Sequence, residues 1–179
     1  MTDDVMTQLA AARTNPSIIM VVGVGGAGGN AVNHMWNLGI KGVDFMVCNT
    51  DQQALDKSPV ELKVRLGSEG LGAGNDPENG RKAAIESLDV VRQRFEASGT
   101  KMVFITAGMG GGTGTGASPV IAKLAKEMGM LTVGIVTSPL AVEGKIRYEQ
   151  AFRGIEELRQ NVDSLLIINN ENILEIYGR

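Results

Sequence analysis

The stretch that decides the fold covers residues 17–30 and reads SIIMVVGVGGAGGN. Its first half is an apolar run of strand length, which is typical of a strand buried on both faces. Its second half contains Gly23-x-Gly25-x-x-Gly28, a fingerprint that lets a phosphate approach backbone N–H groups at the start of a helix. The next ten residues repeat apolar side chains at helical spacing. We therefore expect a strand, a phosphate-binding turn and a helix, although a merely tight turn would also fit the glycines.

Strands and helices continue to alternate along the rest of the chain. The expected strands cover residues 17–23, 43–48, 61–66, 102–106, 131–136 and 164–168. The expected helices lie near residues 30–40, 52–55, 77–95, 120–128, 144–160 and 172–177. Most of these strands are apolar on both faces, which predicts an α/β fold with a parallel sheet covered by helices. In such a sheet a ligand binds at the carboxyl ends of the strands, and the glycine clusters follow those ends.

Size and composition limit the possible functions. The length of 179 residues fits one domain, which we expect over residues 17–179, and we expect residues 1–16 to form a flexible arm. The net charge of −3 and an aromatic content of 4% disfavour nucleic-acid binding. No apolar run approaches the ~20 residues of a membrane helix, and the acidic N-terminus is not a secretory signal. A single cysteine, Cys48, and a single histidine, His34, disfavour disulfides and His- or Cys-rich metal sites and suit a cytoplasmic protein.

The second glycine-rich stretch, residues 108–116, reads GMGGGTGTG. So many glycines are entropically costly in a compact domain, and a nest of backbone N–H groups around anionic oxygens explains them. Thr113 and Thr115 would add hydroxyl donors. No lysine follows the glycines, so this is not a Walker P-loop.

The third glycine cluster, residues 70–77, reads GLGAGNDP and allows two interpretations. It could close over a terminal phosphate from the neighbouring strand. It could equally be a surface loop in which Asp76 caps a helix that begins at Pro77.

Several motifs together resemble the tubulin/FtsZ family, and within it the bacterial cell-division GTPases. They are GVGGAGGNAVNHM, VCNTDQQAL, GLGAGNDPENGR, GGGTGTG, TSPLAVEGKIR and VDSLLIINNENIL, in that order along residues 17–178. The resemblance implies a Rossmann-like sheet of about six strands in the order 3-2-1-4-5-6, with helices on both faces. It also implies that the chain binds GTP or GDP, with Mg²⁺ carried by the nucleotide and no dedicated metal site.

The residues that the resemblance assigns to the nucleotide are Gly25, Gly26, Ala27, Gly28, Gly29, Asn30, Asn49, Ala73, Gly74, Gly108, Gly110, Gly111, Gly112, Thr113, Gly114, Thr115, Gly116, Glu143, Arg147 and Asn170. Ala73 and Gly74 match the loop that senses the γ-phosphate, in a stretch that is shorter here than is usual in the family. Glu143 and Arg147 match groups at the ribose, and Asn170 matches an asparagine at the guanine. A surface ion pair between Glu143 and Arg147, and a turn or cap role for Asn170, are the alternative interpretations.

The resemblance also implies how such a protein works. GTP binding permits head-to-tail self-association, and hydrolysis takes place where an acidic loop of the next subunit completes the site. That loop belongs to a later part of the family's sequence, so we expect no catalytic residue in this chain and little turnover by it alone. Membrane-anchoring and other division partners bind mainly through the later part as well. The expected location is the cytoplasm, at the mid-cell division ring, without nucleic acid or membrane insertion.

Two other functions remain open at this point. The fingerprint Gly23-x-Gly25-x-x-Gly28, with Asp51 after the second strand, also fits an NAD-binding domain of an oxidoreductase. The dense second glycine loop counts against this alternative, because an NAD-binding domain does not need it. The other possibility is an assembly module that needs no nucleotide.

Overall fold

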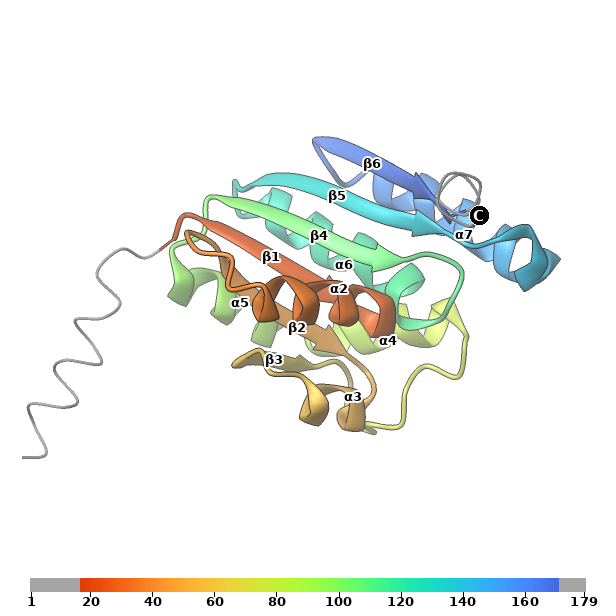
Figure 1. The fold of residues 1–179 in the computed structure, drawn as a ribbon, viewed down its shortest axis with the longest axis horizontal. Helices are drawn as coiled ribbons and strands as arrows, with labels where there is room; N and C mark the ends of the chain where they lie inside the picture. Colours follow the sequence, from red (N-terminus) through yellow and green to blue (C-terminus); the bar gives the residue numbers. More distant parts are fainter. Residues whose placement is uncertain (1–16, 171–179) are drawn as a thin grey trace, which may run out of the picture.

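The computed structural model describes residues 17–170 and contains a parallel sheet of six strands (Figure 1). The strands are β1 (Ile19–Val24), β2 (Asp44–Asn49), β3 (Leu62–Arg65), β4 (Met102–Gly108), β5 (Leu131–Ser138) and β6 (Ser164–Asn169). Their order is β3-β2-β1-β4-β5-β6, which confirms the expected fold class and strand order. The register pairs Val24 with Ala107, Ala107 with Val136 and Val136 with Ile167, so the strands end at a common edge.

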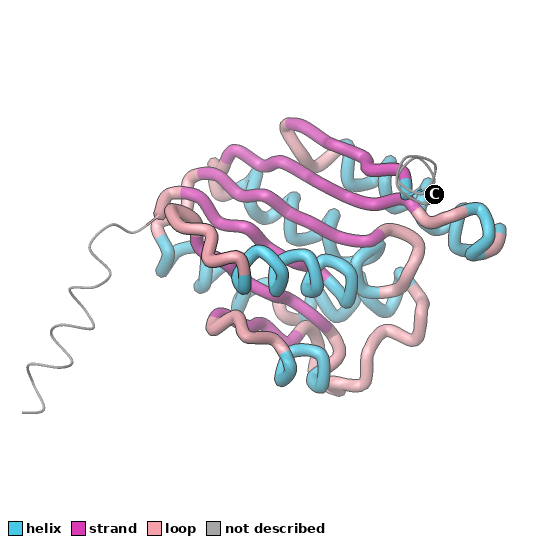
Figure 2. Tube along the Cα trace, viewed as in Figure 1, coloured by secondary structure: helices cyan, strands magenta, loops and turns pink. Residues whose placement is uncertain are grey.

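Helices cover both faces of the sheet, as Figures 1 and 2 show. They are α2 (Gly25–Asn37), α3 (Gln52–Lys57), α4 (Pro77–Glu86), α5 (Leu88–Ser98), α6 (Thr113–Glu127) and α7 (Lys145–Arg159), with a short 3-10 turn, η1 (Ala141–Glu143). α2 and α3 lie on one face, and α4 to α7 lie on the other. On the α2 side, β5 and β6 carry no helix from the described part of the chain, and Leu166 is 56% exposed there.

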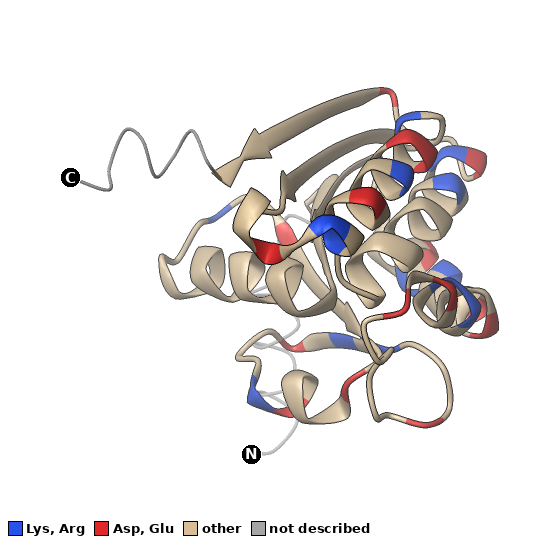
Figure 3. Ribbon diagram, turned by 90° about the vertical axis from the view of Figure 1, so that its right-hand side faces the viewer, with Lys and Arg blue, Asp and Glu red and all other residues tan. Residues whose placement is uncertain are grey.

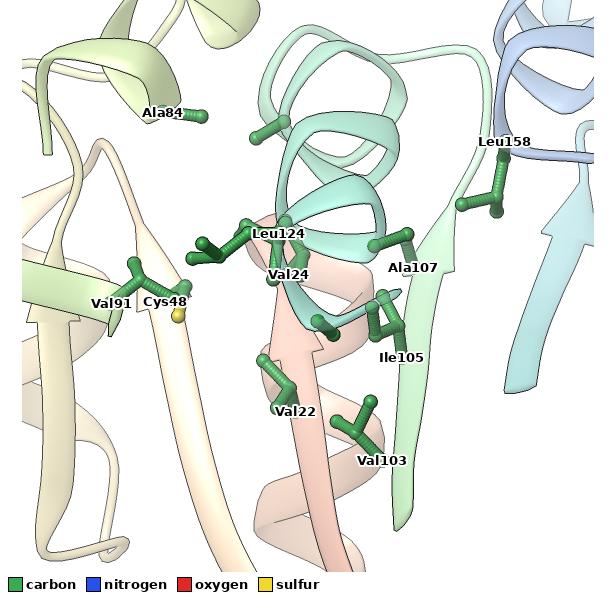
Figure 4. Close-up of a cluster of buried hydrophobic side chains, with 14 of the residues drawn as sticks. Val22, Val24, Cys48, Ala84, Val91, Val103, Ile105, Ala107, Leu124 and Leu158 are labelled. Carbon is green, nitrogen blue, oxygen red and sulfur yellow. The ribbon is translucent and has the colours of Figure 1, made fainter. Parts of the chain in front are cut away.

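The larger core lies between the sheet and α4 to α7 (Figure 4). Alternate residues of the central strands point into it, such as Val22 and Val24 of β1 and Val103 and Ile105 of β4. Cys48 of β2 is fully buried in this core, and burial raises the pKa of its thiol to about 12. The thiol therefore stays protonated and serves as an apolar side chain.

The single helix expected over residues 77–95 is wrong, because the chain forms two helices that break at Ser87. Ser87 leaves helical geometry at φ −101° and ψ 12°. Its hydroxyl accepts a hydrogen bond from the N–H of Gly67 at 2.8 Å. Ser87 therefore joins the break between α4 and α5 to the loop that follows β3.

Other helix ends also differ from the expectation. α2 begins at Gly25 and α6 at Thr113, so several glycines expected in loops lie in the first turns of helices. α2 ends at Asn37, which leaves Ile40 outside the helix and 40% exposed. The expected arm over residues 1–16 and the expected helix over 172–177 lie outside the described residues.

Candidate functional site

A cavity of about 370 Å³ opens at the carboxyl edge of the sheet, where β1, β4, β5 and β6 end. Its lining residues are Val24, Gly26, Ala27, Ala73, Asn75, Gly108, Met109, Gly111, Gly112, Thr113, Gly114, Thr137, Ser138, Pro139, Glu143, Arg147 and Asn170. Figure 3 is seen from the side on which the strands end in Figure 1. The sequence of α2 contains no Lys, Arg, Asp or Glu. Backbone groups rather than charges must therefore dominate that wall of the cavity.

The N-terminus of α2 supplies the first set of backbone donors. The helix starts at Gly25 without a side-chain cap, so its first N–H groups are free to bind a ligand. Gly25 has φ +74°, and a Cβ there would lie 2.8 Å from the nitrogen of Gly114 in α6. Only glycine fits this position, and its absence of a side chain brings the starts of α2 and α6 together.

The N-terminus of α6 supplies the second set. Gly112 precedes the helix and also makes no side-chain cap. The loop before it is held by Thr115, whose Oγ1 accepts a hydrogen bond from the N–H of Gly110 at 2.8 Å. Two helix N-termini with unsatisfied N–H groups and positive dipole ends thus face one cavity, which favours an anion such as a phosphate chain.

The loop after β3 closes the cavity from the side of α4. An isolated antiparallel bridge joins Leu71 to Asp51, and the N–H of Gly72 donates to the carbonyl of Thr50 at 3.2 Å. The loop then turns between Ala73 and Asp76, whose N–H donates back to the Ala73 carbonyl at 3.1 Å. Both interpretations of this cluster therefore describe part of the structure, because Asp76 caps α4 while the preceding residues line the cavity.

The opposite end of the cavity is polar and carries the ion pair of Glu143 and Arg147. The guanidinium donates to Glu143 Oε2 at 2.7 Å, and the N–H of Leu140 donates to Glu143 Oε1 at 2.9 Å. The backbone hydrogen bond first, and then the guanidinium, lower the pKa of Glu143 below its usual value of 4.5. The carboxylate is therefore charged at neutral pH and can accept hydrogen bonds from hydroxyl groups, beside the side chain of Asn170.

The structure brings most of the predicted residues together, but not all of them. Eleven line the cavity: Gly26, Ala27, Ala73, Gly108, Gly111, Gly112, Thr113, Gly114, Glu143, Arg147 and Asn170. Four border a smaller hollow of about 240 Å³ between α2 and α3: Gly25, Gly29, Asn30 and Asn49. The remaining five, outside both hollows, are Gly28, Gly74, Gly110, Thr115 and Gly116.

We expected the hydroxyls of both Thr113 and Thr115 to face the ligand, and the structure differs from this expectation at Thr115. Thr115 is 2% exposed, and its hydroxyl is directed at Gly110 instead of the cavity. Thr113 does line the cavity, and its Oγ1 lies 2.7 Å from Oγ1 of Thr50. Thr115 therefore shapes the loop, whereas Thr113 can contact a ligand directly.

Sequence reasoning missed several lining residues: Val24, Asn75, Met109, Thr137, Ser138 and Pro139. Most of them lie at the end of a strand or directly after one. That position was itself a signal, because ligands of a parallel sheet bind at the carboxyl ends of its strands. Asn75 gave a different signal, because it lies in a glycine-rich turn without being glycine.

Within residues 17–170, no group of three or more His, Cys, Asp or Glu side chains is arranged to hold a metal ion. The donors that are present suit a phosphate chain, whose own oxygens would provide most ligands of a magnesium ion. None of the helices between residues 17 and 170 is long and apolar enough to cross a membrane.

Comparisons with known proteins agree with this geometry. Residues 18–178 match the family model described as the tubulin/FtsZ family, GTPase domain. The chain is 54% identical over 165 residues to the cell division protein FtsZ of Porphyromonas gingivalis and 52% identical over 169 residues to that of Wigglesworthia glossinidia brevipalpis. These matches cover 90% and 93% of this chain but 36% and 44% of the relatives.

The chain is also similar to solved structures of FtsZ and CetZ proteins. An empty FtsZ dimer from M. jannaschii superposes with a TM-score of 0.88 at 40% identity, over 98% of this chain and 52% of that one. A GTPγS-bound protofilament of CetZ2 from Haloferax volcanii gives a TM-score of 0.79 at 28% identity, over 86% of this chain and 49% of the other. This chain therefore spans about half or less of the length of the proteins it matches.

Proposed function

The chain belongs to the tubulin/FtsZ family, and from that membership we propose that it is the GTP- and GDP-binding domain of a GTPase that polymerises in bacterial cell division. The observation that carries the proposal is the cavity at the carboxyl edge, with two helix N-termini on one wall and Glu143, Arg147 and Asn170 at the far end. That arrangement suits a molecule that is polyanionic at one end and rich in hydroxyl and amide groups at the other.

The strand order supports a proposed direction for the nucleotide in the cavity. Asn170 follows β6 and the Glu143–Arg147 pair follows β5, whereas the helix N-termini follow β4 and β1. The guanine and ribose then lie toward β6 and β5, and the phosphates lie over Gly111–Gly114 and Gly26–Ala27. Backbone N–H groups bind the phosphate oxygens, the carboxylate of Glu143 accepts from ribose hydroxyls, and Arg147 holds that carboxylate in place.

Magnesium fits this arrangement only together with the nucleotide. Thr113, at the start of α6, lines the cavity with its hydroxyl beside the proposed phosphate position, and Asn49 and Asp51 border the adjoining hollow. When bound, the ion would neutralise charge on the phosphate chain. Hydrolysis itself is proposed to need an acidic loop of a second subunit, in a head-to-tail filament at the mid-cell ring in the cytoplasm. Division partners would bind mainly through a later part of the family's sequence.

The first test is the identity of any nucleotide released when the purified protein is denatured, together with titration calorimetry of GTP, GDP and NAD. Guanine nucleotides should be released or should bind, and NAD should not compete with them. Binding of NAD alone would favour an oxidoreductase domain. No binding and no rise in melting temperature with GDP would favour an assembly module.

A matched pair of variants tests the orientation of the nucleotide. Arg147→Ala should weaken GDP binding more than Lys145→Ala does, because Arg147 lines the cavity while Lys145 has an 88% exposed side chain. Both changes remove one positive charge near the start of α7. Equal losses in the two variants would contradict the assignment of this end of the cavity to the nucleotide.

A further inference from the structure

The outer edge of β6 lacks the usual sequence protection of an edge strand. No strand among residues 17–170 pairs with this edge, because β6 ends the sheet and pairs with β5 (Figure 1). Its sequence, Ser164-Leu-Leu-Ile-Ile-Asn169, contains no charged residue, proline or glycine. Edge strands usually carry a charge, a proline or a bulge, because an open edge otherwise pairs with another chain. In composition β6 therefore resembles an interior strand.

The opposite edge of the same sheet is protected. β3 is four residues long, and two of them are Lys63 and Arg65. A short strand with positive side chains discourages pairing with a second chain. β6 is six residues long, and four of its residues are leucine or isoleucine. The chain thus protects one edge of its sheet and leaves the other able to pair.

Exposed apolar side chains continue from this edge onto both faces of the sheet. On the α2 side Leu166 is 56% exposed, and on the α7 side Ile167 is 38% exposed. α7 adds two aromatic side chains one helical turn apart, Tyr148 and Phe152, which are 56% and 63% exposed. The surface around β6 is therefore apolar as well as open.

The two aromatic residues lie on the flank of α7 that faces the β6 end of the sheet. Leu158 points from α7 into the core (Figure 4), and Glu157 pairs with Arg81 of α4 on one flank of the helix. At 3.6 residues per turn, Tyr148 and Phe152 lie on the other side of Leu158 from Glu157. Because α4 and α6 are on the β4 side of α7, this second flank faces β6.

The charged groups near this surface are paired within the chain. Arg159 Nε lies 3.4 Å from Glu156 Oε1, and Lys126 Nζ lies 3.6 Å from Asp163 Oδ1. Each pair is neutral overall, so two copies of the surface would repel each other little. A second copy of this chain therefore has the matching chemistry, because it is apolar, lacks unpaired charge and offers an edge of its own.

We propose that two copies of this chain associate through β6, so that the two strands pair antiparallel and each copy contributes six strands to one continuous sheet. A two-fold axis normal to the sheet relates the copies, since this operation sets β6 antiparallel to its own copy with both α7 helices on one face. The aromatic flanks of the two α7 helices then meet on that face. Leu166 lies in the middle of the strand, so the two copies of Leu166 lie near the axis on the other face.

This contact differs from head-to-tail association. It uses neither helix N-terminus of the cavity, so it needs no nucleotide. About eight residues a side, six from β6 and two from α7, form it, whereas a standard interface has roughly 20–30. We therefore expect a weak dimer that assembles at micromolar concentrations or above.

The test is sedimentation equilibrium of the whole chain between about 5 and 500 μM, a range that brackets a weak dimer, with and without GDP. Leu166→Lys places a charge on the edge strand. Its matched control is Leu38→Lys, directly after α2, where the leucine is 64% exposed. Phe152→Arg charges the flank of α7 beside β6. Its control is Ile146→Arg, 72% exposed and three turns before Glu157 on the opposite flank.

The wild type should form a dimer whose dissociation constant changes less than about twofold with GDP. Leu166→Lys and Phe152→Arg should each raise that constant by about tenfold or more, and the two controls should change it less than about threefold. All four positions are exposed, so each variant should keep the wild-type circular dichroism spectrum. A wild type that stays monomeric, equal effects of the controls, or association that requires GDP would overturn the proposal. So would a monomer whose β6 amides are protected from hydrogen exchange, because another part of the same chain would then cover the edge.

Discussion

At the scale of single residues, the cavity is shaped by buried side chains that do not themselves face it. Thr115 is 2% exposed, its hydroxyl accepts from Gly110, and its methyl group lies against Gly154 of α7. One small side chain therefore joins the glycine loop to the helix that carries Arg147. Its effect on ligand binding must pass through the shape of that loop.

Thr115→Ala should leave the Gly110 N–H without a partner and lower the free energy of unfolding by about 1–3 kcal/mol. Nucleotide affinity should fall as well, because the loop before α6 loses its anchor. Thr115→Ser retains the hydroxyl and should preserve most of the affinity. Chemical denaturation and calorimetric titration measure the two effects, and equal loss of affinity in both variants would contradict this role of the hydroxyl.

The Glu143 carboxylate should give the protein a measurable dependence on acid. Its pKa in the folded chain lies below the usual 4.5, so folding favours the charged form. The resulting stabilisation is complete above about pH 4.5 and is lost as the pH falls through the folded pKa. We expect Glu143→Gln to be less stable than the wild type at pH 6, with a difference that shrinks toward pH 3.

Unfolding curves between pH 3 and pH 6 measure this difference. Glu96→Gln, on an exposed face of α5, is the matched control and should not reproduce the trend. A Glu143→Gln difference that stays constant over the whole range would show that the hydrogen bond and the ion pair leave the carboxyl unaffected.

At the scale of elements, close approach between helices determines where glycine is required. α4 crosses the start of α6 so closely that a Cβ on Gly116 would overlap the Pro77 carbonyl. A Cβ on Gly80 would lie 2.5 Å from the Gly112 carbonyl. The glycines of residues 108–116 therefore serve packing as well as the anion site, a division that the sequence alone did not reveal.

Gly116→Ala should separate α4 from α6 and destabilise the protein by several kcal/mol, because the clash is with backbone. Gly29→Ala is the matched control, since an added Cβ there meets nothing within 4 Å and α2 gains helix propensity. That control should raise the free energy of unfolding by about 0.5–1 kcal/mol when no nucleotide is present. Thermal or urea unfolding measures both changes in stability. An unchanged free energy of unfolding in Gly116→Ala would show that α4 and α6 can move apart freely.

The strands and their order could be predicted, because apolar runs such as Met20–Val22 and the motifs around them are local in sequence. The break at Ser87 could not, since the residue that contacts its hydroxyl, Gly67, lies twenty residues away. The cavity was predicted at the correct edge, and the glycine loops line it. The inward hydroxyl of Thr115 and the lining position of Asn75 depend on how separate loops stack, which no local pattern encodes.

At the scale of the whole molecule, the chain places the N-termini of α2 and α6 at one cavity but matches only part of its relatives. It covers 36% and 44% of the two curated proteins. The resemblance assigns water activation to a later segment of the family. Among residues 17–170, the charged side chains that line the cavity are Glu143 and Arg147, and these two are paired with each other.

We therefore expect the purified chain to bind GTP and to hydrolyse it very slowly, because phosphoryl transfer needs a group that orients the attacking water. Phosphate release is measured with the chain alone and after addition of a full-length relative whose acidic loop can complete the site. Adding the full-length relative should raise the rate of phosphate release. A variant of that relative with uncharged residues in its acidic loop should not raise it. Rapid turnover by the chain alone, after removal of contaminating GTPases, would contradict a site divided between subunits.

Cys48 has a practical consequence for studying this molecule. It is the single cysteine of the sequence, it lies on the interior strand β2, and its thiol is both fully buried and held protonated. A thiol-specific reagent can therefore react only when the sheet opens around β2, so the labelling rate reports the frequency of that opening without any engineered probe. Labelling followed by mass spectrometry would measure the rate of these native-state fluctuations. A ligand that binds at the carboxyl edge of the sheet should lower the labelling rate in proportion to the occupancy of the ligand.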